Sequence, residues 1–322
     1  MEGDPHVTVR GHTHPLLLAL RDIKLAHTVF ALPFALLAAF LALPAAADAI
    51  RWPPFLGALS LVLACMVFAR TWAMLINRIA DHRIDADNPR TARRAIAAGE
   101  LRVGHAIAIA CACAGAFLAC CAAFLAFDNP WPIILGAPVL AWIALYSFTK
   151  RFTWLAHLFL GGALAVSPIA AAIAVDPTTI GLPLADAPAA LAPSGVTTLL
   201  LAGFVMLWVG GFDILYALQD LDFDRAAGLH SIPARFGRRG AAWISRALHG
   251  GAVALLFGAA SADERLGLTF TVASILVAGL LITEHVVVAV RGLAGLPLAF
   301  FTINGVVSLI LGAAGIADLI LV

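Results

Sequence analysis

The chain has 322 residues, of which 62% are hydrophobic and only 12% are charged, and its formal net charge is +1. A soluble globular domain usually carries about 25% charged residues, so half that share cannot cover a water-facing surface of this size. The composition therefore excludes a soluble domain and predicts a polytopic membrane protein. No nucleic-acid partner is expected.

Nine apolar stretches, each roughly 17–25 residues long, are expected to cross a bilayer. They run over residues 28–47, 55–76, 104–127, 131–148, 154–175, 196–217, 241–259, 268–290 and 296–321. They are too long and too uniformly apolar for barrel strands, so they predict an all-α fold. The first stretch follows Arg10, Arg21 and Lys24 and lacks a small-residue cleavage site. It is expected to be a retained helix rather than a signal peptide.

Lysine and arginine are distributed unevenly between the two expected sides. If residues 1–23 form a cytoplasmic N-terminal segment, 17 of the 20 basic residues fall on the inner side. Only Arg51 and Arg265 fall on the outer side, and Arg70 lies within a helix. The positive-inside rule predicts this asymmetry for an N-in, C-out chain. We expect a multi-pass protein of the cytoplasmic (inner) membrane, with residues 24–322 as a single transmembrane domain in the lipid bilayer.

The first acidic cluster continues the second apolar stretch through Asn77, Asp81 and Asp85. Their spacing of i, i+4 and i+8 places all three on one face if the helix continues. Arg70 lies two turns earlier on the same face, and the basic segment 90–94 follows. Carboxylates near membrane depth are costly and are usually functional, so this face is a candidate site.

The second acidic cluster ends the sixth apolar stretch and contains Asp213, Asp220 and Asp224. Their spacing of i, i+7 and i+11 predicts a single stripe on a helix. The segment 230–235, which ends in Arg235, follows this cluster as a second basic loop. Both clusters are expected at the cytoplasmic ends of their helices, so two halves of the chain should meet around one site.

The residue types in these clusters indicate a particular chemistry. Carboxylates at i, i+4 repel one another unless a cation lies between them. Mg²⁺ takes one or two carboxylates and leaves positions for substrate phosphate, and nearby arginines and lysines suit the remaining phosphate charge. The sequence therefore predicts a Mg²⁺–diphosphate site at the mouth of an apolar cavity, facing the cytoplasm. A ligand with a charged head and a long apolar tail fits such a site.

Other reactive residues have simpler interpretations. His82 lies off the acidic face and is expected at the surface. Histidines within apolar stretches are expected to be packed or interfacial; they are His105, His157 and His249. All five cysteines lie inside expected helices without His or Asp ligands, and we expect them to be small packing residues; they are Cys65, Cys111, Cys113, Cys120 and Cys121.

Both acidic motifs resemble those of the UbiA superfamily of membrane prenyltransferases. Asn77-x-x-x-Asp81-x-x-x-Asp85 is similar to its first aspartate-rich motif, and Asp213-x-x-Tyr216-x-x-x-Asp220-x-x-x-Asp224 is similar to its second. Tyr146-Ser147-x-x-Lys150-Arg151 and Phe300-Phe301-x-x-Asn304-Gly305 also fit. The resemblance covers the chain from about Ile23 onward. It implies nine transmembrane helices around a central cavity that opens to lipid at the side.

The resemblance also implies roles for individual residues. Mg²⁺ would be the cofactor, and a polyprenyl diphosphate would be the donor substrate. The implied metal ligands, which are also catalytic residues, are Asp81, Asp85, Asp220 and Asp224, with Asp213 as a further catalytic aspartate. The implied diphosphate-binding residues are Asn77, Arg90, Arg94 and Lys150. Arg70 and Tyr146 would shape the aromatic-acceptor end, where Arg70 would pair with an acceptor carboxylate.

Several segments, including Asn88-Pro89-Arg90-Thr91 and Gly228-Leu229-His230-Ser231-Ile232-Pro233, are similar to one bacterial branch of this superfamily. That branch is labelled 4-hydroxybenzoate polyprenyltransferase and is associated with the futalosine route to menaquinone. The implied acceptor is a hydroxylated aromatic carboxylate, either 4-hydroxybenzoate or 1,4-dihydroxy-6-naphthoate, in respiratory quinone synthesis. Another UbiA-type acceptor stays open, as does a secondary transporter whose carboxylates bind Na⁺ or H⁺. Transporter sites tend to lie at the bilayer midplane, whereas both clusters here lie at helix ends.

Overall fold

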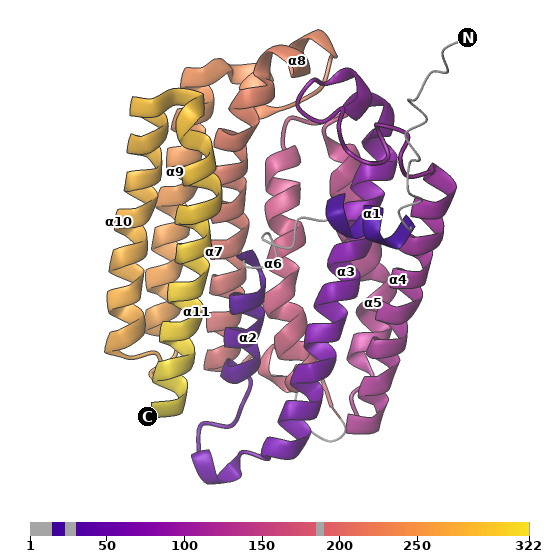
Figure 1. The fold of residues 1–322 in the computed structure, drawn as a ribbon. Helices are drawn as coiled ribbons and strands as arrows, with labels where there is room; N and C mark the ends of the chain where they lie inside the picture. Colours follow the sequence, from indigo (N-terminus) through magenta and orange to yellow (C-terminus); the bar gives the residue numbers. More distant parts are fainter. Residues whose placement is uncertain (1–14, 23–29, 185–189, 322) are drawn as a thin grey trace, which may run out of the picture.

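The computed structural model describes residues 15–22, 30–184 and 190–321, and long helices dominate these residues. Nine helices run side by side along one axis (Figure 1). They are α2 (Leu32–Leu41), α3 (Trp52–Asp87), α4 (Val103–Ala123), α5 (Trp131–Thr149), α6 (Ala156–Val175), α7 (Pro193–Tyr216), α9 (Ile232–Ala262), α10 (Leu268–Arg291) and α11 (Asn304–Leu321). Two short helices are α1 (Pro15–Asp22) and α8 (Leu221–Ala226). The expected all-α fold is confirmed, whereas most of the expected N-terminal segment 1–23 lies outside the described residues.

Within the described residues, seven helical segments are long and apolar enough to cross a membrane. They are Trp52–Asp87, Val103–Phe127, Trp131–Thr149, Ala156–Val175, Pro193–Ala226, Leu268–Gly295 and Leu298–Leu321. Two helices of the bundle are not among them. α2 has only 10 residues, and the first half of α9 carries four arginines, Arg235, Arg238, Arg239 and Arg246. The multi-pass architecture follows from the seven segments, while nine spans and the N-in orientation stay predictions.

The ends of α2 and α9 differ from the expected apolar stretches. α2 ends at Leu41 rather than continuing to residue 47, because the pyrrolidine ring of Pro44 cannot continue a helix. α9 begins at Ile232, nine residues before the apolar stretch at Ala241. Ser231 caps this helix, since its hydroxyl oxygen accepts a hydrogen bond from the backbone N–H of Ala234 at 3.2 Å.

α7 lies in the middle of the bundle, packed between α6 and α9. Its aromatic residues Phe204, Trp208 and Phe212 belong to the largest core cluster, and Trp208 is fully buried. The contact with α6 is close because Gly161 has no side chain. A Cβ atom at Gly161 would overlap the carbonyl oxygen of Met206 on α7. Small residues allow membrane helices to approach in this way, and here they bring α6 and α7 together beside the candidate site.

The short helix α2 also touches α11, the last helix of the described chain. A Cβ atom at Gly312 of α11 would lie 2.5 Å from the Cβ of Pro33 on α2. One at Gly315 would lie 2.6 Å from Leu37. Arg265, which precedes α10, donates hydrogen bonds to the carbonyl oxygens of Leu41 (2.9 Å) and Leu43 (3.0 Å) at the end of α2. These contacts satisfy carbonyls that a helix end leaves free and close the bundle along an α2–α11 seam.

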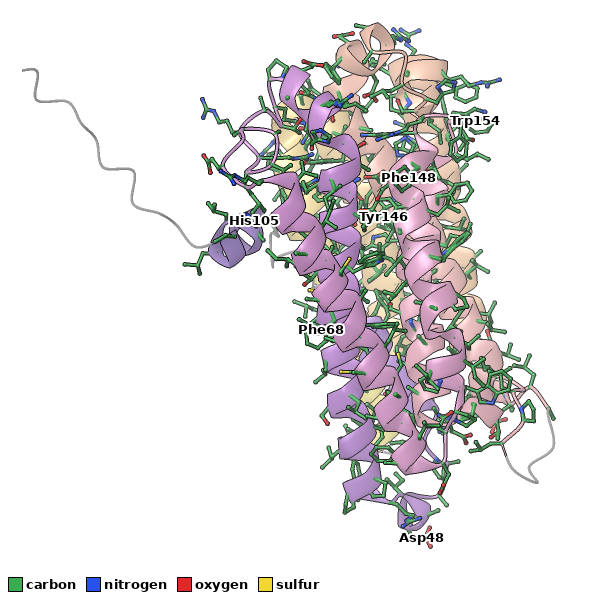
Figure 2. All side chains as sticks on the ribbon, turned by 90° about the vertical axis from the view of Figure 1, so that its right-hand side faces the viewer. Asp48, Phe68, His105, Tyr146, Phe148 and Trp154 are labelled. Carbon is green, nitrogen blue, oxygen red and sulfur yellow. The ribbon has the colours of Figure 1, made fainter. Side chains whose placement is uncertain are left out.

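Charged side chains collect at one end of the bundle. In Figure 2, nitrogen-bearing side chains gather around the end that includes Trp154, while Asp48 marks the opposite end. α8 and the connection between α3 and α4 lie at the same end in Figure 1. Both acidic clusters of the sequence belong to this end, as expected.

Candidate active site

A large cavity lies between α3, α4, α5, α6 and α7 and measures about 940 Å³. Along α6 its lining runs from Leu160 to Ala174, a rise of about 21 Å for 14 residues. Most of the wall is apolar, whereas Asn77, Arg78 and Arg90 gather at one end. The expected apolar interior is therefore present, with polar residues at one end of it. None of the lining belongs to α9, α10 or α11, although Phe300, which precedes α11, contributes.

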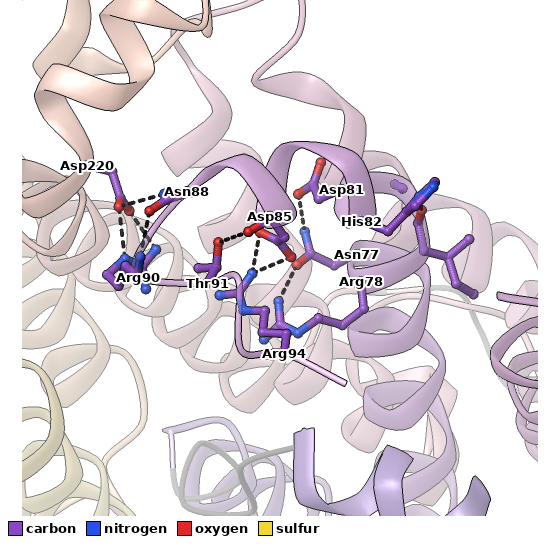
Figure 3. Close-up of polar contacts among 12 residues, drawn as sticks. Asn77, Arg78, Asp81, His82, Asp85, Asn88, Arg90, Thr91, Arg94 and Asp220 are labelled. Carbon is purple, nitrogen blue, oxygen red and sulfur yellow. Dashed lines mark hydrogen bonds and ion pairs between the residues drawn. The ribbon is translucent and has the colours of Figure 1, made fainter. Parts of the chain in front are cut away.

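The first acidic motif lies on one continuous helix, as predicted. α3 extends to Asp87, so Asn77, Asp81 and Asp85 share a face (Figure 3). The amide of Asn77 donates a hydrogen bond to Asp81 at 3.3 Å. Asp81 is 2% exposed and Asp85 is 5% exposed. Carboxylates buried this deeply need compensating partners.

Basic side chains supply those partners. The Nζ of Lys150 lies 2.6 Å from Asp81, and Arg151 lies 3.3 Å from the other oxygen of the same carboxylate. Arg94 donates to both oxygens of Asp85 at 2.7 Å (Figure 3). Lys150 and Arg94 are two of the residues expected to bind diphosphate, and the structure places each on an expected metal ligand.

Arg90 joins the two acidic motifs across 130 residues of sequence. Its guanidinium donates to both oxygens of Asp220, with Nε at 2.8 Å and Nη2 at 2.6 Å. Asn88 adds a hydrogen bond to Asp220 at 3.2 Å (Figure 3). Burial lowers the pKa of Arg90, but the hydrogen bonds and the charge of Asp220 outweigh this effect, so the pKa lies above its usual value. This bidentate pair brings the expected two halves together at one site.

The second acidic motif does not form the single stripe that its spacing predicts. α7 ends at Tyr216, a 3₁₀ turn covers Ala217–Asp220, and α8 follows. A 3₁₀ turn has about 3.0 residues per turn instead of 3.6 and rotates the residues after it. The three carboxylates therefore meet three different partners. Asp220 binds Arg90, Asp224 accepts a hydrogen bond from Ser231 at 2.9 Å, and Asp213 contacts His157.

The contact between Asp213 and His157 was not expected from the sequence. The imidazole Nδ1 of His157 on α6 lies 2.6 Å from Oδ2 of Asp213 on α7. His157 is buried, as expected of a histidine in an apolar stretch. However, it packs against a residue of the candidate site. A lone histidine 56 positions from its partner leaves no pattern that could reveal the contact.

The residues expected at the aromatic-acceptor end line the cavity. Arg70 and Tyr146 both lie in its wall, and Figure 2 marks Tyr146 just below Phe148, toward the end that includes Trp154. The ring of Tyr216 contacts that of Phe300 in a tilted arrangement, with a centroid distance of 4.1 Å. The guanidinium of Arg90 lies 5.6 Å from the centre of the Tyr216 ring. The polar and aromatic parts of the motifs are therefore continuous along one wall.

Metal binding at this site is supported by donor chemistry rather than by a formed cage. No group of three or more His, Cys, Asp or Glu in the described part of the chain is arranged to hold an ion. The carboxylates of Asp81, Asp85, Asp220 and Asp224 are hard oxygen donors that suit Mg²⁺. Three of them are bound to Lys150, Arg94 and Arg90. They could hold Mg²⁺ once those cations turn to another anion.

Two further expectations concern residues beside this site. Cys65 and Cys121 contribute to the cavity wall, and Cys121 is buried as expected of a packing residue, whereas Cys111 is exposed. His82 was expected at the surface, but it is half-buried, and its ring lies 2.8 Å from the carbonyl oxygen of Ile79.

Comparisons with known proteins point to one family. The model of the UbiA prenyltransferase family matches residues 31–306. A UbiA homolog from Aeropyrum pernix, solved in its apo form, is 33% identical, with a TM-score of 0.75 over 92% of this chain and 98% of that one. A UbiA homolog from Archaeoglobus fulgidus bound to GPP and Mg²⁺ shares the fold, with a TM-score of 0.67 over 95% of this chain and 99% of that one, at 21% identity.

Curated relatives have narrower coverage. A 4-hydroxybenzoate octaprenyltransferase from Marinobacter nauticus is 34% identical over 53% of this chain and 52% of its own length. A protoheme IX farnesyltransferase from Geobacter sulfurreducens is 31% identical over 61% of this chain and 64% of its own. The chain thus spans about half to two thirds of the length of these relatives. The family match covers most of the chain, and the chain belongs to the UbiA prenyltransferase family.

Proposed function

We propose that this protein is a Mg²⁺-dependent membrane enzyme that transfers a polyprenyl group from an allylic diphosphate to a hydroxylated aromatic carboxylate. The observation that carries the proposal is the Arg90–Asp220 pair, which joins two carboxylate clusters at the polar end of a long apolar cavity. A substrate with a diphosphate head and a prenyl tail matches this arrangement, because the head suits the polar end of the cavity and the tail suits its apolar interior. Related chains named as octaprenyl- and farnesyltransferases support the same reaction class.

In the proposed reaction, the basic residues change partners. Arg90, Arg94 and Lys150 turn from their carboxylates to the diphosphate oxygens, and the carboxylates hold the metal. Mg²⁺, when bound, supplies positive charge that stabilises the leaving diphosphate. Preorganised charges of this kind are usually the largest contribution to catalysis. The apolar wall of the cavity then keeps water away from the allylic cation.

The acceptor occupies the part of the cavity lined by Arg70 and Tyr146. The guanidinium of Arg70 pairs with a carboxylate of the acceptor and fixes its ring toward the allylic carbon. Arg70→Gln is expected to raise the KM for the aromatic acceptor at least about tenfold, the loss of one charged hydrogen bond, and to leave the KM for the diphosphate unchanged. Steady-state kinetics with each substrate varied separately measures both, and an unchanged acceptor KM would contradict the role.

The location and extent of the enzyme are part of the proposal. The excess of Lys and Arg on one side of the chain supports an N-in protein of the cytoplasmic membrane with its site at the cytoplasmic face. The family match over residues 31–306 supports one catalytic domain over residues 24–322. The acceptor is either 4-hydroxybenzoate, as in the name of the Marinobacter relative, or 1,4-dihydroxy-6-naphthoate, in respiratory quinone synthesis.

Membranes that contain the protein, supplied with Mg²⁺ and a long polyprenyl diphosphate, test the function directly. Each acceptor is offered separately, and a third arm combines haem with farnesyl diphosphate because of the Geobacter relative. Prenylation of 4-hydroxybenzoate alone assigns ubiquinone synthesis, and prenylation of the dihydroxynaphthoate alone assigns menaquinone synthesis. Prenylation of haem alone would replace the proposed acceptor class. If no acceptor is prenylated while control membranes with a known prenyltransferase are active, the proposed function is wrong.

A further inference from the structure

Asp213 differs from every other carboxylate of the site in where it lies. Among the described residues that line the cavity, it is the one acidic side chain. Its side chain is 22% exposed, and it lies on α7 one helical turn before Tyr216. Asp81, Asp85 and Asp220 are instead held by lysine or arginine. Asp213 is thus the carboxylate that faces the space where an acceptor ring would lie.

The hydrogen bonds of His157 determine which of its nitrogens carries a proton. The backbone N–H of Ile232, at the start of α9, points at Nε2 of His157 from 3.3 Å. A backbone N–H can only donate, so Nε2 presents its lone pair. In the neutral ring the proton then lies on Nδ1. From there it is donated to Oδ2 of Asp213 at 2.6 Å.

The position of Ile232 is itself held by neighbouring contacts. Ser231 caps α9 and donates a hydrogen bond to Asp224 at 2.9 Å. The backbone N–H of His230 donates to the carbonyl oxygen of Lys150 at 2.7 Å. The donor that selects the tautomer of His157 is therefore anchored to both halves of the site. Among the described residues, no side chain or backbone N–H donates to the other oxygen of Asp213, Oδ1.

We propose that His157 is a positioning residue that holds Asp213 as the acceptor of the proton released by the aromatic ring. This inference rests on the proposed function. A bond forms between a ring carbon and the allylic carbon, and the allylic C–O bond breaks with its electron pair leaving on the diphosphate. The C–H electron pair returns to the ring, and the proton passes to Oδ1 of Asp213. The step balances without an oxidant or reductant.

Two substitutions separate the two hydrogen bonds of His157. An asparagine amide reaches roughly the position of Nδ1, so His157→Asn keeps a donor to Asp213 and loses the acceptor for Ile232. A glutamine amide reaches roughly the position of Nε2, so His157→Gln keeps the acceptor and loses the donor. A merely structural histidine would tolerate both changes or neither. A positioning residue for Asp213 tolerates the first and not the second.

The kinetic test uses the full-length protein in membranes, Mg²⁺, the polyprenyl diphosphate, and the acceptor that the wild type prenylates. This acceptor carries either hydrogen or deuterium at the carbon that becomes prenylated. His157→Gln and Asp213→Asn are expected to lower kcat by about 10²–10⁴, the usual contribution of a general base, with an unchanged KM for the diphosphate. Both should show a primary deuterium effect larger than that of the wild type, and His157→Asn should stay near wild type. Equal losses in both histidine variants, or no added isotope effect in His157→Gln, would overturn the proposal.

A second measurement is independent of turnover. In protein labelled with ¹⁵N-histidine, the resonances of His157, assigned by their loss in His157→Asn, should show a protonated Nδ1 and a bare Nε2. The opposite tautomer would overturn the role of His157 even if prenylation is normal. If the wild type prenylates no acceptor, both the proposed function and the proton transfer to Asp213 are wrong. If the wild type prenylates an acceptor but the tautomer or the variants differ from expectation, only the inference about His157 and Asp213 is wrong.

Discussion

Three basic residues of the site each hold a carboxylate that the proposed reaction needs for the metal. Lys150 is bound to Asp81 and Arg94 to Asp85, and Arg90 makes the same kind of pair with Asp220. These pairs compensate charges that would be costly to bury alone. They also mean that metal and diphosphate must displace existing ion pairs. Diphosphate that binds the basic residues frees the carboxylates for the metal, and metal that binds the carboxylates frees the basic residues for diphosphate.

Removing one cation from such a pair should have opposite effects on the two ligands. Arg94→Gln frees Asp85, so the affinity of the protein for Mg²⁺ alone is expected to rise. The affinity for the prenyl diphosphate should fall at least about tenfold, because a charged hydrogen bond is lost. Calorimetric titration of the detergent-solubilised protein measures both. Arg83→Gln, an exposed neighbour on α3, is the control, and a change of the same sign for both ligands would contradict the exchange.

The first motif makes a simpler prediction about turnover. Asp81→Asn keeps the size of a buried side chain but removes the negative charge that holds the metal. We expect kcat to fall at least about 10²-fold, the cost of losing a preorganised charge at the reacting centre. Asp87→Asn, on the exposed side of the same helix, should leave kcat unchanged. Prenylation assays of both variants at equal membrane content measure this, and near-normal activity of Asp81→Asn would refute the site.

At the scale of helices, the α6–α7 contact positions His157 and Asp213. Gly161→Ala places a methyl group against the carbonyl oxygen of Met206, so the helices must separate. We expect the free energy of unfolding to fall by about 1–3 kcal/mol, a value typical of overpacking. The midpoint of thermal unfolding in detergent should fall with it. Gly115→Ala on α4 is the matched control, because no atom lies within 4 Å of the added methyl group. If both variants unfold at the wild-type temperature, the close approach does not stabilise the bundle.

How much the sequence could predict also differs between helices. The i, i+4, i+8 spacing of Asn77, Asp81 and Asp85 has meaning only on a continuous helix, and α3 is continuous there. The second motif has a spacing that fits a helix equally well, yet a 3₁₀ turn interrupts it at Ala217–Asp220. No Gly or Pro marks this interruption, so local sequence could not reveal it.

The sequence also could not predict which residues of the candidate site contact one another across distant helices. The two motifs and their basic segments were predicted to meet, because both lie at helix ends on the same side. The particular partners depend on how α6, α7 and α9 pack. His157 meets Asp213 only because Gly161 lets α6 approach α7, and Ile232 reaches the imidazole only because α9 begins there. Such partners require the three-dimensional arrangement.

At the scale of the whole molecule, the cavity would limit the length of the prenyl chain in the proposed reaction. Ala170 lines the wall about 15 Å along α6 from Leu160, on the side away from the charged residues. Ala170→Phe should block the far part of the cavity. The preference for long over short prenyl diphosphates should therefore fall at least about tenfold, a value typical of one blocked pocket. Competition between a long and a short donor measures the ratio. Ala112→Phe on the exposed face of α4 should not change it, and an unchanged ratio in Ala170→Phe would exclude this path for the tail.

The α2–α11 seam has a consequence for the order of biosynthesis. α2 is made before α11, to which Gly312 and Gly315, the residues that pack against Pro33 and Leu37, belong. The bundle therefore stays open on that side until the ribosome has delivered α11. A nascent chain that stalls before α11 exposes the inner face of α2 to lipid or to a chaperone. Membrane quality control could recognise molecules that lack α11 by that uncovered face.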